Sequence, residues 1–256
     1  MLSLDIDKIK DKLTESCDIK VLPVIDSTNN YLKEAVKSGL TDTTAVLAER
    51  QTDGRGRRGR TFYSPENTGL YLSLYKKLVP DDLTAVTIKT AVAVCRGIER
   101  VTGKSPSVKW VNDLYLNNKK ICGILTEPVW KNDGKLLGAV IGVGINCFGT
   151  AFPKELSEIA GCISKTDDFD RNSLAAEVIS QILKLLEESA KSIISEYKSR
   201  CFVIGKKIEV ISDKTEEGTA LDIDDGGGLV VRMSNGEIRT LTTGEISIKL
   251  YKERKI

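Results

Sequence analysis

Residues 108–146 of this 256-residue chain read VKWVNDLYLNNKKICGILTEPVWKNDGKLLGAVIGVGIN. Short apolar runs within this stretch predict successive strands at residues 108–110, 114–116, 121–126 and 136–145. Asn117 and Asn118 separate the second strand from the third, and they predict a tight hairpin turn. The stretch therefore predicts a group of neighbouring strands in one sheet.

Helical patterns lie on both sides of this strand group. The expected helices span residues 26–39, 83–101 and about 172–198. Two further strands are expected upstream, at residues 44–49 and 69–75. Because the strands cluster between helices without a regular β-α-β alternation, we expect an α+β fold with a mixed β-sheet flanked by helices.

The sequence pattern changes after Cys201. Short β-rich runs separated by glycines follow it, at residues 208–211, 229–233 and 246–250. Runs of this kind are typical of a small barrel. We therefore expect a main domain at residues 1–202 and a small C-terminal β-barrel domain at residues 203–256.

The composition excludes several classes of chemistry. The chain has 38 Lys and Arg against 36 Asp and Glu, so its net charge of +2 lacks the excess typical of a nucleic-acid-binding protein. It contains no histidine, which excludes Ser-His-Asp and Cys-His nucleophile systems and histidine metal sites.

The cysteines and the apolar runs indicate a cellular compartment. The 6 cysteines are scattered without a C-x-x-C motif, which predicts inert reduced thiols in a reducing compartment. The longest apolar run, residues 136–145, is far shorter than the roughly 20 residues of a membrane-spanning helix. We therefore expect a cytoplasmic protein that does not enter a membrane.

Residues 50–60 carry five arginines and one aspartate. They include G-x-G-x-x-G at residues 54–59, but a turn and a strand follow, whereas the dinucleotide fingerprint must open a helix. Composition alone leaves open a solvated basic loop or a nucleic-acid patch. Glycines let the backbone approach a ligand, and arginine forks suit phosphate or carboxylate oxygens. One small anionic ligand, or two anions brought together, explains this alternation of glycine and arginine better than a nucleic-acid duplex does.

Two further motifs, KWVNDLYL at residues 109–116 and KKICGILTE at residues 119–127, would each alone be read as a strand with a polar turn. Together with GRGRRGR at residues 54–60 and GVGIN at residues 142–146, in this order, they closely resemble the biotin protein ligases. Those enzymes attach biotin to a lysine of a carrier protein. The resemblance runs from about Val24 to the C-terminus.

The resemblance implies a class II synthetase-like ligase core and a reaction in two steps. The biotin carboxylate attacks the α-phosphate of ATP, and a lysine of the biotin carboxyl carrier protein then attacks the acyl-adenylate. Biotin and ATP are the implied substrates. Mg²⁺ would accompany ATP through phosphate oxygens and water, and no protein ligand to it can be named.

The resemblance also assigns roles to individual residues. The residues implied for biotin are Ser27, Thr28, Asn29, Gln51, Arg55, Gly56, Arg57, Lys120 and Gly123. Those implied for the nucleotide are Arg57, Arg58, Arg60, Phe62, Asn112, Lys120 and Asn146. Lys120, Arg57 and Asp113 are the implied catalytic residues, and Lys120 would hold the carboxylate and the α-phosphate together.

Some of these roles have alternatives. Ser27 and Thr28 also suit a helix cap. Asp113 is either the base that accepts the proton of the attacking amine or an orienting partner for a cationic side chain. The segments expected to order around the acyl-adenylate are the arginine-rich loop and residues 149–165.

The chain departs from the family pattern at two positions. Val111 stands where the family usually has proline, and this change should affect turn rigidity more than chemistry. Phe62 stands where a tryptophan is common, and it keeps a flat surface for stacking on adenine while losing an N–H donor.

Other functions and assemblies stay open from the sequence. About 20 residues precede the matching core, too few for the helix-turn-helix domain of repressor-type members, so we expect no DNA binding. Residues 136–145 could form an edge strand that pairs two subunits, and a monomer is equally consistent. A lipoate or octanoate ligase and a basic-loop nucleic-acid-binding module are the rival functions.

Overall fold

The structure, a computed structural model, describes residues 3–78, 83–149, 152–212, 214–242 and 247–250. These residues form one sheet of seven strands and one of five. The strands of the larger sheet are β1 (Asp18–Ile25), β2 (Thr44–Gln51), β3 (Gly69–Lys76), β4 (Ser107–Lys109), β5 (Asp113–Leu116), β6 (Lys119–Trp130) and β7 (Leu136–Asn146). The helices are α1 (Ile6–Lys10), α2 (Thr28–Lys37), α3 (Leu83–Thr102), α4 (Arg171–Glu187) and α5 (Ala190–Arg200). The smaller sheet contains β8 (Lys207–Ile211), β9 (Thr215–Ile223), β10 (Leu229–Met233), β11 (Ile238–Leu241) and β12 (Ser247–Leu250).

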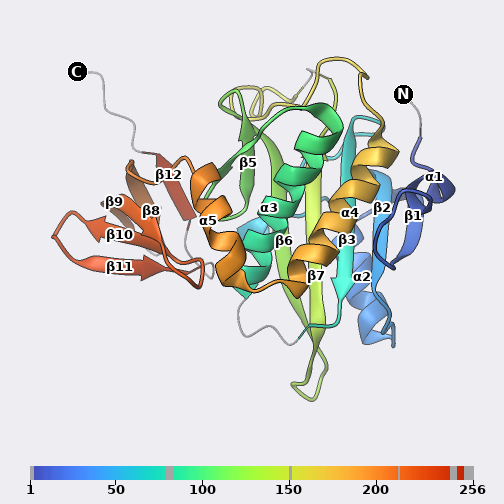
Figure 1. The fold of residues 1–256 in the computed structure, drawn as a ribbon, viewed down its shortest axis with the longest axis horizontal. Coiled ribbons are helices and arrows are strands. Elements are labelled where there is room, and N and C mark those ends of the chain that lie inside the picture. Colours follow the sequence, from blue (N-terminus) through green and yellow to red (C-terminus); the bar gives the residue numbers. More distant parts are fainter. Residues whose placement is uncertain (1–2, 79–82, 150–151, 213, 243–246, 251–256) are drawn as a thin grey trace.

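The larger sheet has the strand order β1-β2-β3-β7-β6-β5-β4. β1 and β2 are parallel, and the other neighbours are antiparallel. In Figure 1, α3 and α4 lie across one face of this sheet. α2 packs on the opposite face through Leu32 and Val36, in a separate small core. The predicted α+β fold with a mixed sheet flanked by helices is therefore confirmed.

The alternation of side chains along β3 and β7 separates the two faces of the sheet. The core residues of these strands under α3 and α4 are Leu70, Leu72, Leu74, Ile141, Val143 and Ile145. The residues between them, Tyr71 and Ser73 on β3 and Gly142 and Gly144 on β7, face the α2 side. The two glycines lower the surface of the sheet there, and the space above them belongs to the site described below.

The suggestion that residues 136–145 form an edge strand was wrong. β7 lies inside the sheet and pairs with β3 along one side and with β6 along the other. A nearly continuous apolar run is what a strand covered on both faces requires, and an edge strand does not need it. Within the described part of the larger sheet, β1 and β4 form the edges.

The helix predicted from about Asn172 to Lys198 is two helices. Glu188 and Ser189 adopt extended backbone conformations between α4 and α5, and the Ser189 side chain accepts a hydrogen bond from the Ser192 N–H. An N-cap of this kind satisfies a backbone N–H donor that the start of a new helix leaves without a partner.

The predictions also missed α1, β1, β9 and β11. The predicted hairpin at Asn117 and Asn118 is present, and these residues have φ of 50° and 62°.

The smaller sheet is antiparallel, with the order β11-β10-β9-β8-β12. Its end strands, β11 and β12, do not pair with each other within the described residues, so the expected barrel is instead an open sheet. The buried side chains of Ile208 and Leu229 belong to the same core as α3 and α4. In addition, the Trp110 indole Nε1 donates to the carbonyl of Gly227 at 3.0 Å. The second sheet is thus attached to the turn that follows β4.

The cysteines behave as core residues. All six are free, and Cys95 and Cys147 are fully buried. Burial raises the pKa of both thiols to about 12, so they stay protonated at neutral pH. Across the described part of the chain, no helix combines the length and apolarity that crossing a membrane demands.

Candidate active site

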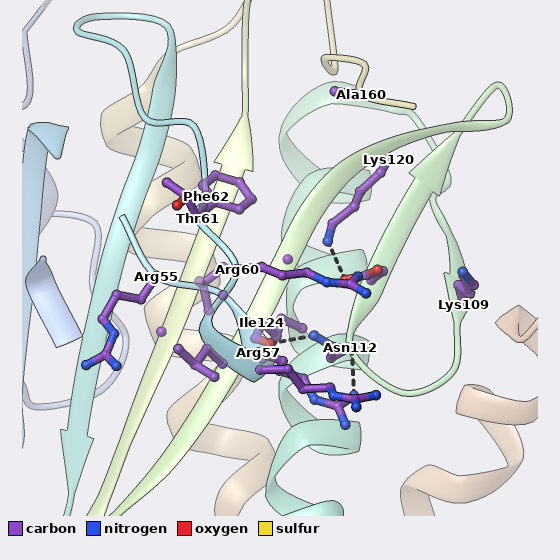
Figure 2. A pocket seen from close by; sticks show the side chains of 18 of the residues that line it. Arg55, Arg57, Arg60, Thr61, Phe62, Lys109, Asn112, Lys120, Ile124 and Ala160 are labelled. Atoms are coloured by element: carbon purple, nitrogen blue, oxygen red, sulfur yellow. Dashed lines mark hydrogen bonds and ion pairs between the residues drawn. The ribbon is translucent and has the colours of Figure 1, made fainter. Parts of the chain in front are cut away.

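A cavity of about 990 Å³ lies over the glycines of the larger sheet, on the α2 side. The predicted site residues that line it are Ser27, Thr28, Asn29, Gln51, Arg55, Gly56, Arg57, Arg58, Arg60, Phe62, Asn112, Asp113, Lys120 and Gly123. Figure 2 shows several of these side chains converging from the loop before β3 and from the strands β5 and β6. The fold therefore brings together residues that are far apart in the sequence.

The floor of the cavity depends on glycine. A Cβ atom at Gly142 would collide with the Asn29 amide, and a Cβ at Gly144 would lie 2.6 Å from the Phe62 ring. At Gly123, a Cβ would lie 3.3 Å from both Lys120 Nζ and Phe62 Cε2. The ring of Phe62 thus rests on the same strand surface that was predicted to hold the biotin tail.

This position bears on the predicted role of Phe62. Its ring meets Tyr71 edge-on, with 6.5 Å between the ring centroids. Phe62 was assigned to the nucleotide and Gly123 to biotin, yet the two are in contact. In this structure Phe62 is a wall of the space above Gly123 and Gly144, and its stacking on adenine stays a prediction.

The neutral end of the cavity lies at the N-terminus of α2. Ser27 caps the helix by accepting a hydrogen bond from the Asn30 N–H at 3.5 Å, so the alternative reading of Ser27 as a cap holds. Thr28 donates from its backbone N–H to Gln51 Oε1 at 2.9 Å, and its hydroxyl oxygen lies 3.0 Å from the same atom. Gln51 Nε2 in turn donates to Ser64 at 3.0 Å. These side chains are held by one another before any ligand arrives.

Residues 54–60, called the arginine loop from here on, form a closed turn. The Gly56 N–H donates to the Arg60 carbonyl and the Phe62 N–H donates to the Gly54 carbonyl, each at 2.7 Å. Residues 57–59 form a short 3₁₀ turn, with Arg58 at φ 58° and Gly59 at φ 69°. The left-handed φ at Gly59 suits a residue without a side chain.

The arginines of this loop point in different directions. Arg57 Nη1 donates to Asn112 Oδ1 at 3.2 Å, inside the cavity (Figure 2). Arg55 Nη1 donates to Asn30 Oδ1 at 2.8 Å on α2, and Arg58 Nη1 donates to the Ile211 carbonyl at 3.2 Å on the second sheet. Burial lowers the pKa of Arg57, and Asp113 acts against that shift. An arginine keeps its charge under such a shift, so Arg57 presents a partly desolvated cation.

Lys120 and Asp113 form the ion pair at the charged end of the cavity. Lys120 Nζ lies 2.6 Å from Asp113 Oδ1, and Figure 2 marks this contact. A register shift between β5 and β6 at Leu114 and Tyr115 accompanies the pairing. Asn112 Nδ2 donates to the Ile124 carbonyl at 2.8 Å, which fixes the amide that Arg57 contacts. The geometry matches the reading of Asp113 as an orienting partner, and its role as a base stays a prediction.

Asn146 does not line the cavity. Its Nδ2 donates to the carbonyl of Gly161 at 2.9 Å, and it therefore holds the loop that precedes α4. The backbone of that loop bonds to β6, because the Lys120 N–H donates to the Ile159 carbonyl at 2.8 Å. Any contact between Asn146 and the nucleotide would be indirect in this arrangement.

Sequence reasoning missed part of the wall. The cavity residues that it did not name include Leu156, Ile159 and Ala160 of the loop before α4, Tyr115 of β5, Phe202 after α5, and Glu209 of β8 in the second sheet. Residues 149–165 were expected only to order on binding, without individual roles. Their spacing has neither a helical nor a strand period, so no local signal marked them as a wall.

The acidic residues that line the cavity are Asp113 and Glu209. No group of three or more Cys, Asp or Glu side chains placed to hold a metal ion occurs in the described residues. The protein thus supplies no cage for Mg²⁺ there.

Comparison with known proteins identifies the family. Residues 21–146 match the model of the Biotin/lipoate A/B protein ligase family, and residues 203–249 match that of the biotin protein ligase C-terminal domain. The chain is similar to the bifunctional ligase/repressor BirA of Salmonella typhimurium, with 35% identity over 96% of this chain and 78% of that protein. It is also similar to the biotin–[acetyl-CoA-carboxylase] ligase of Mycobacterium tuberculosis, with 26% identity over 89% of this chain and 88% of that one.

A solved structure agrees with these relatives. The biotin protein ligase from Aquifex aeolicus in complex with biotin and ATP superposes with a TM-score of 0.79 at 27% identity, covering 91% of this chain and 99% of that chain. The chain belongs to the biotin protein ligase family, and the resemblance seen in its sequence is confirmed.

Proposed function

We propose that this protein activates biotin with ATP to biotinyl-5′-AMP and then transfers the biotinyl group to a lysine of a carrier protein. The observation that carries the proposal is one cavity with two chemically different ends. One end presents the neutral polar side chains of Thr28, Asn29 and Gln51, and the other presents the cations of Arg57 and Lys120. A ligand with a neutral ring and an anionic tail can place its ring at the neutral end and its tail toward the cations. An anionic polyphosphate fits the cationic end.

In the first step, a biotin carboxylate oxygen attacks the α-phosphorus of ATP, and pyrophosphate leaves. Both reactants are anions, so their approach needs cations where charge gathers, in a site drier than bulk water. Lys120 supplies the cation between the two reacting groups, and Arg57 supplies one that retains the adenylate once it has formed. When the substrates arrive, Lys120 Nζ exchanges its contact with Asp113 for contacts to the carboxylate and the α-phosphate. This places the reacting atoms in attack geometry.

In the second step, a neutral lysine amine of the carrier attacks the acyl carbon, an amide bond forms, and AMP leaves. Lysine has a pKa of about 10.4, so the attacking amine must lose a proton. Asp113 lies within the cavity beside Lys120 and is our candidate to accept that proton. Leu156 and Ile159 add apolar surface to the cavity lining, and closure of their loop over the bound acyl-adenylate would keep water from it.

We further propose the biotin carboxyl carrier protein as the acceptor, Mg²⁺ bound to ATP as the metal, and the cytoplasm as the site of action. The relative from Mycobacterium tuberculosis is named as a ligase of biotin to acetyl-CoA carboxylase, which supports a carrier of that kind. Six free cysteines suit a reducing compartment. A monomer and a homodimer both remain compatible with the fold.

The test is a pair of assays on the purified chain. We expect biotin-dependent exchange of labelled pyrophosphate into ATP, followed by transfer of labelled biotin to a carrier domain. Lipoate added in excess should not compete in either assay. Exchange that depends on lipoate in place of biotin would overturn the proposal in favour of a lipoate ligase, and salt-sensitive RNA or DNA binding without exchange would favour the nucleic-acid module.

A further inference from the structure

Behind the neutral end of the cavity lies a chain of hydrogen-bonded side chains that begins at a carboxylate. Glu127 of β6 accepts from Lys33 Nζ at 2.8 Å and from Asn29 Nδ2 at 2.9 Å. Its exposed side-chain fraction is 24%, and that of Lys33 is 18%. Burial by itself would raise the pKa of Glu127, but the hydrogen bonds from Asn29 and Lys33 outweigh it, and the pKa is lowered. Glu127 is therefore an anion that can only accept hydrogen bonds.

The next member of the chain is Ser73, which is fully buried on β3. Its hydroxyl oxygen lies 2.5 Å from Asn29 Oδ1 and 2.7 Å from Thr28 Oγ1. Ser73 and Glu127 do not touch the cavity themselves, whereas Thr28 and Asn29 line it. The residues behind the wall thus contact the residues that form it. We call Thr28, Ser73, Asn29 and Glu127 the polar chain.

The direction of the hydrogens along the polar chain follows from counting donors. Because Glu127 only accepts, the Asn29 amide must turn its NH₂ group toward Glu127 and its oxygen toward Ser73. That oxygen carries no hydrogen, so the single hydroxyl hydrogen of Ser73 must be donated to it. Ser73 then has no hydrogen left and can only accept from Thr28.

The same count limits what the wall offers to a ligand. Asn29 Nδ2 uses its hydrogens on Glu127 and, at 3.4 Å, on the carbonyl of Leu125. The Thr28 hydroxyl hydrogen has two acceptors in reach, Ser73 Oγ and Gln51 Oε1, so either choice spends it within the protein. From Thr28 and Asn29, what remains for the cavity is lone pairs on Thr28 Oγ1 and Asn29 Oδ1. The neighbouring Ser27 hydroxyl and the second hydrogen of Gln51 Nε2 can still donate.

We propose that Glu127 and Ser73 are positioning residues that fix Thr28 and Asn29 as acceptors toward the cavity, and that these two residues select ligands with ring N–H donors. The inference rests on the proposed function, because the cyclic urea of biotin carries such N–H groups. A ligand without these hydrogens would leave buried lone pairs unpaired or would clash with them, and this costs binding. The Lys33 ammonium keeps Glu127 charged and so keeps the direction of the chain.

Glu127→Gln tests this with little change in volume. A glutamine amide can donate as well as accept, so the Asn29 amide can turn over and the direction of the chain is lost. We expect the KM for biotin to rise roughly tenfold to a hundredfold while the KM for ATP and kcat change little. Ser73→Ala should act in the same direction. Glu34→Gln, which removes an equal charge from an exposed residue on α2, should behave as wild type.

The specific readout is discrimination between biotin and biotin methylated on a ring nitrogen, measured as the ratio of kcat/KM in the exchange assay. Wild type should prefer biotin by at least about tenfold, and Glu127→Gln should reduce this preference. An unchanged preference and KM in folded Glu127→Gln would overturn the inference while leaving the ligase function intact. Equal use of both compounds by wild type would overturn it without any variant. No biotin-dependent exchange in wild type would overturn the proposed function, and the inference with it.

Discussion

At the N-terminus of α2, Thr28 and Asn29 are bonded to side chains of the central strands β2, β3 and β6. The arginine loop instead sends its side chains in three directions, to α2, to Asn112 and to the second sheet. The first region is built on a helix and on central strands. The second is built on a short closed loop and on an ion pair between neighbouring strands. Regular buried elements hold a geometry more tightly than loops do.

This difference suggests a division of labour. The region at α2 is organised before a ligand binds, which suits recognition of a neutral ring that does not change during the reaction. The cationic region makes contacts that the substrates can replace, which suits charge that develops during the reaction. Changes in the first region should therefore raise the KM for biotin, and changes in the second should lower kcat.

Lys120→Ala should have the largest effect. It removes the cation that bridges the two anionic reactants, and loss of one such group typically costs about a hundredfold to a thousandfold in rate. Pyrophosphate exchange measures the step directly. Lys135→Ala, on the exposed turn between β6 and β7, is the control for a lost lysine charge. Near-normal exchange in Lys120→Ala would remove Lys120 from its assigned place.

Asp113→Asn should come next and should separate the two steps. If Asp113 accepts the proton of the attacking amine, adenylate formation is spared and transfer to the carrier slows by about a hundredfold. Single-turnover transfer from preformed adenylate, compared with pyrophosphate exchange, gives both rates. Equal loss in both assays would show that Asp113 only orients Lys120 across their 2.6 Å contact.

Gly142→Ala tests the region at the N-terminus of α2. The added methyl group would collide with the Asn29 amide and displace it, and a lost hydrogen-bond partner typically costs about 1–3 kcal/mol, so the KM for biotin should rise about tenfold or more. The KM for ATP should change little, because Asn29 lies at the neutral end. A parallel rise in both constants would mean that the two regions are not independent.

Arg57→Gly should have the smallest effect of the four variants, because the first step is spared. We expect adenylate to form but to leave the cavity, because the partly buried guanidinium that contacts Asn112 no longer retains it. The measurement is free biotinyl-5′-AMP in the filtrate after separation from the enzyme, with an increase of several-fold expected from the loss of a charge-assisted hydrogen bond. Wild-type release would show that another group retains the intermediate.

The extent to which sequence predicted the fold can be seen strand by strand. The run at residues 136–145 was correctly identified as a strand, because its apolar period is local, but its position was wrong. β7 is an interior strand because it pairs with β3, which lies about seventy residues earlier in the chain. The break between α4 and α5 was missed because the apolar pattern continues across Glu188 and Ser189, where only the backbone conformation changes.

The candidate site shows the same limit. The motifs identified Lys120, Arg57 and Asp113, and the cavity contains all three. The contact of Phe62 with Gly123 and Gly144 was not predicted, because it depends on how the arginine loop folds back over β6 and β7.

The sequence by itself determined the class of the fold, a helix cap within residues 26–29, the hairpin at residues 117–118 and the chemical identity of the cationic residues. Each of these depends on side-chain type and on short-range periodicity, which a linear chain carries. Only the tertiary structure decided that Ser73 stands behind Asn29, 44 positions away, and that Glu127 stands behind it at 98 positions. A hydrogen bond is directional and short, so its partners become known only when packing has brought the strands and the helix together.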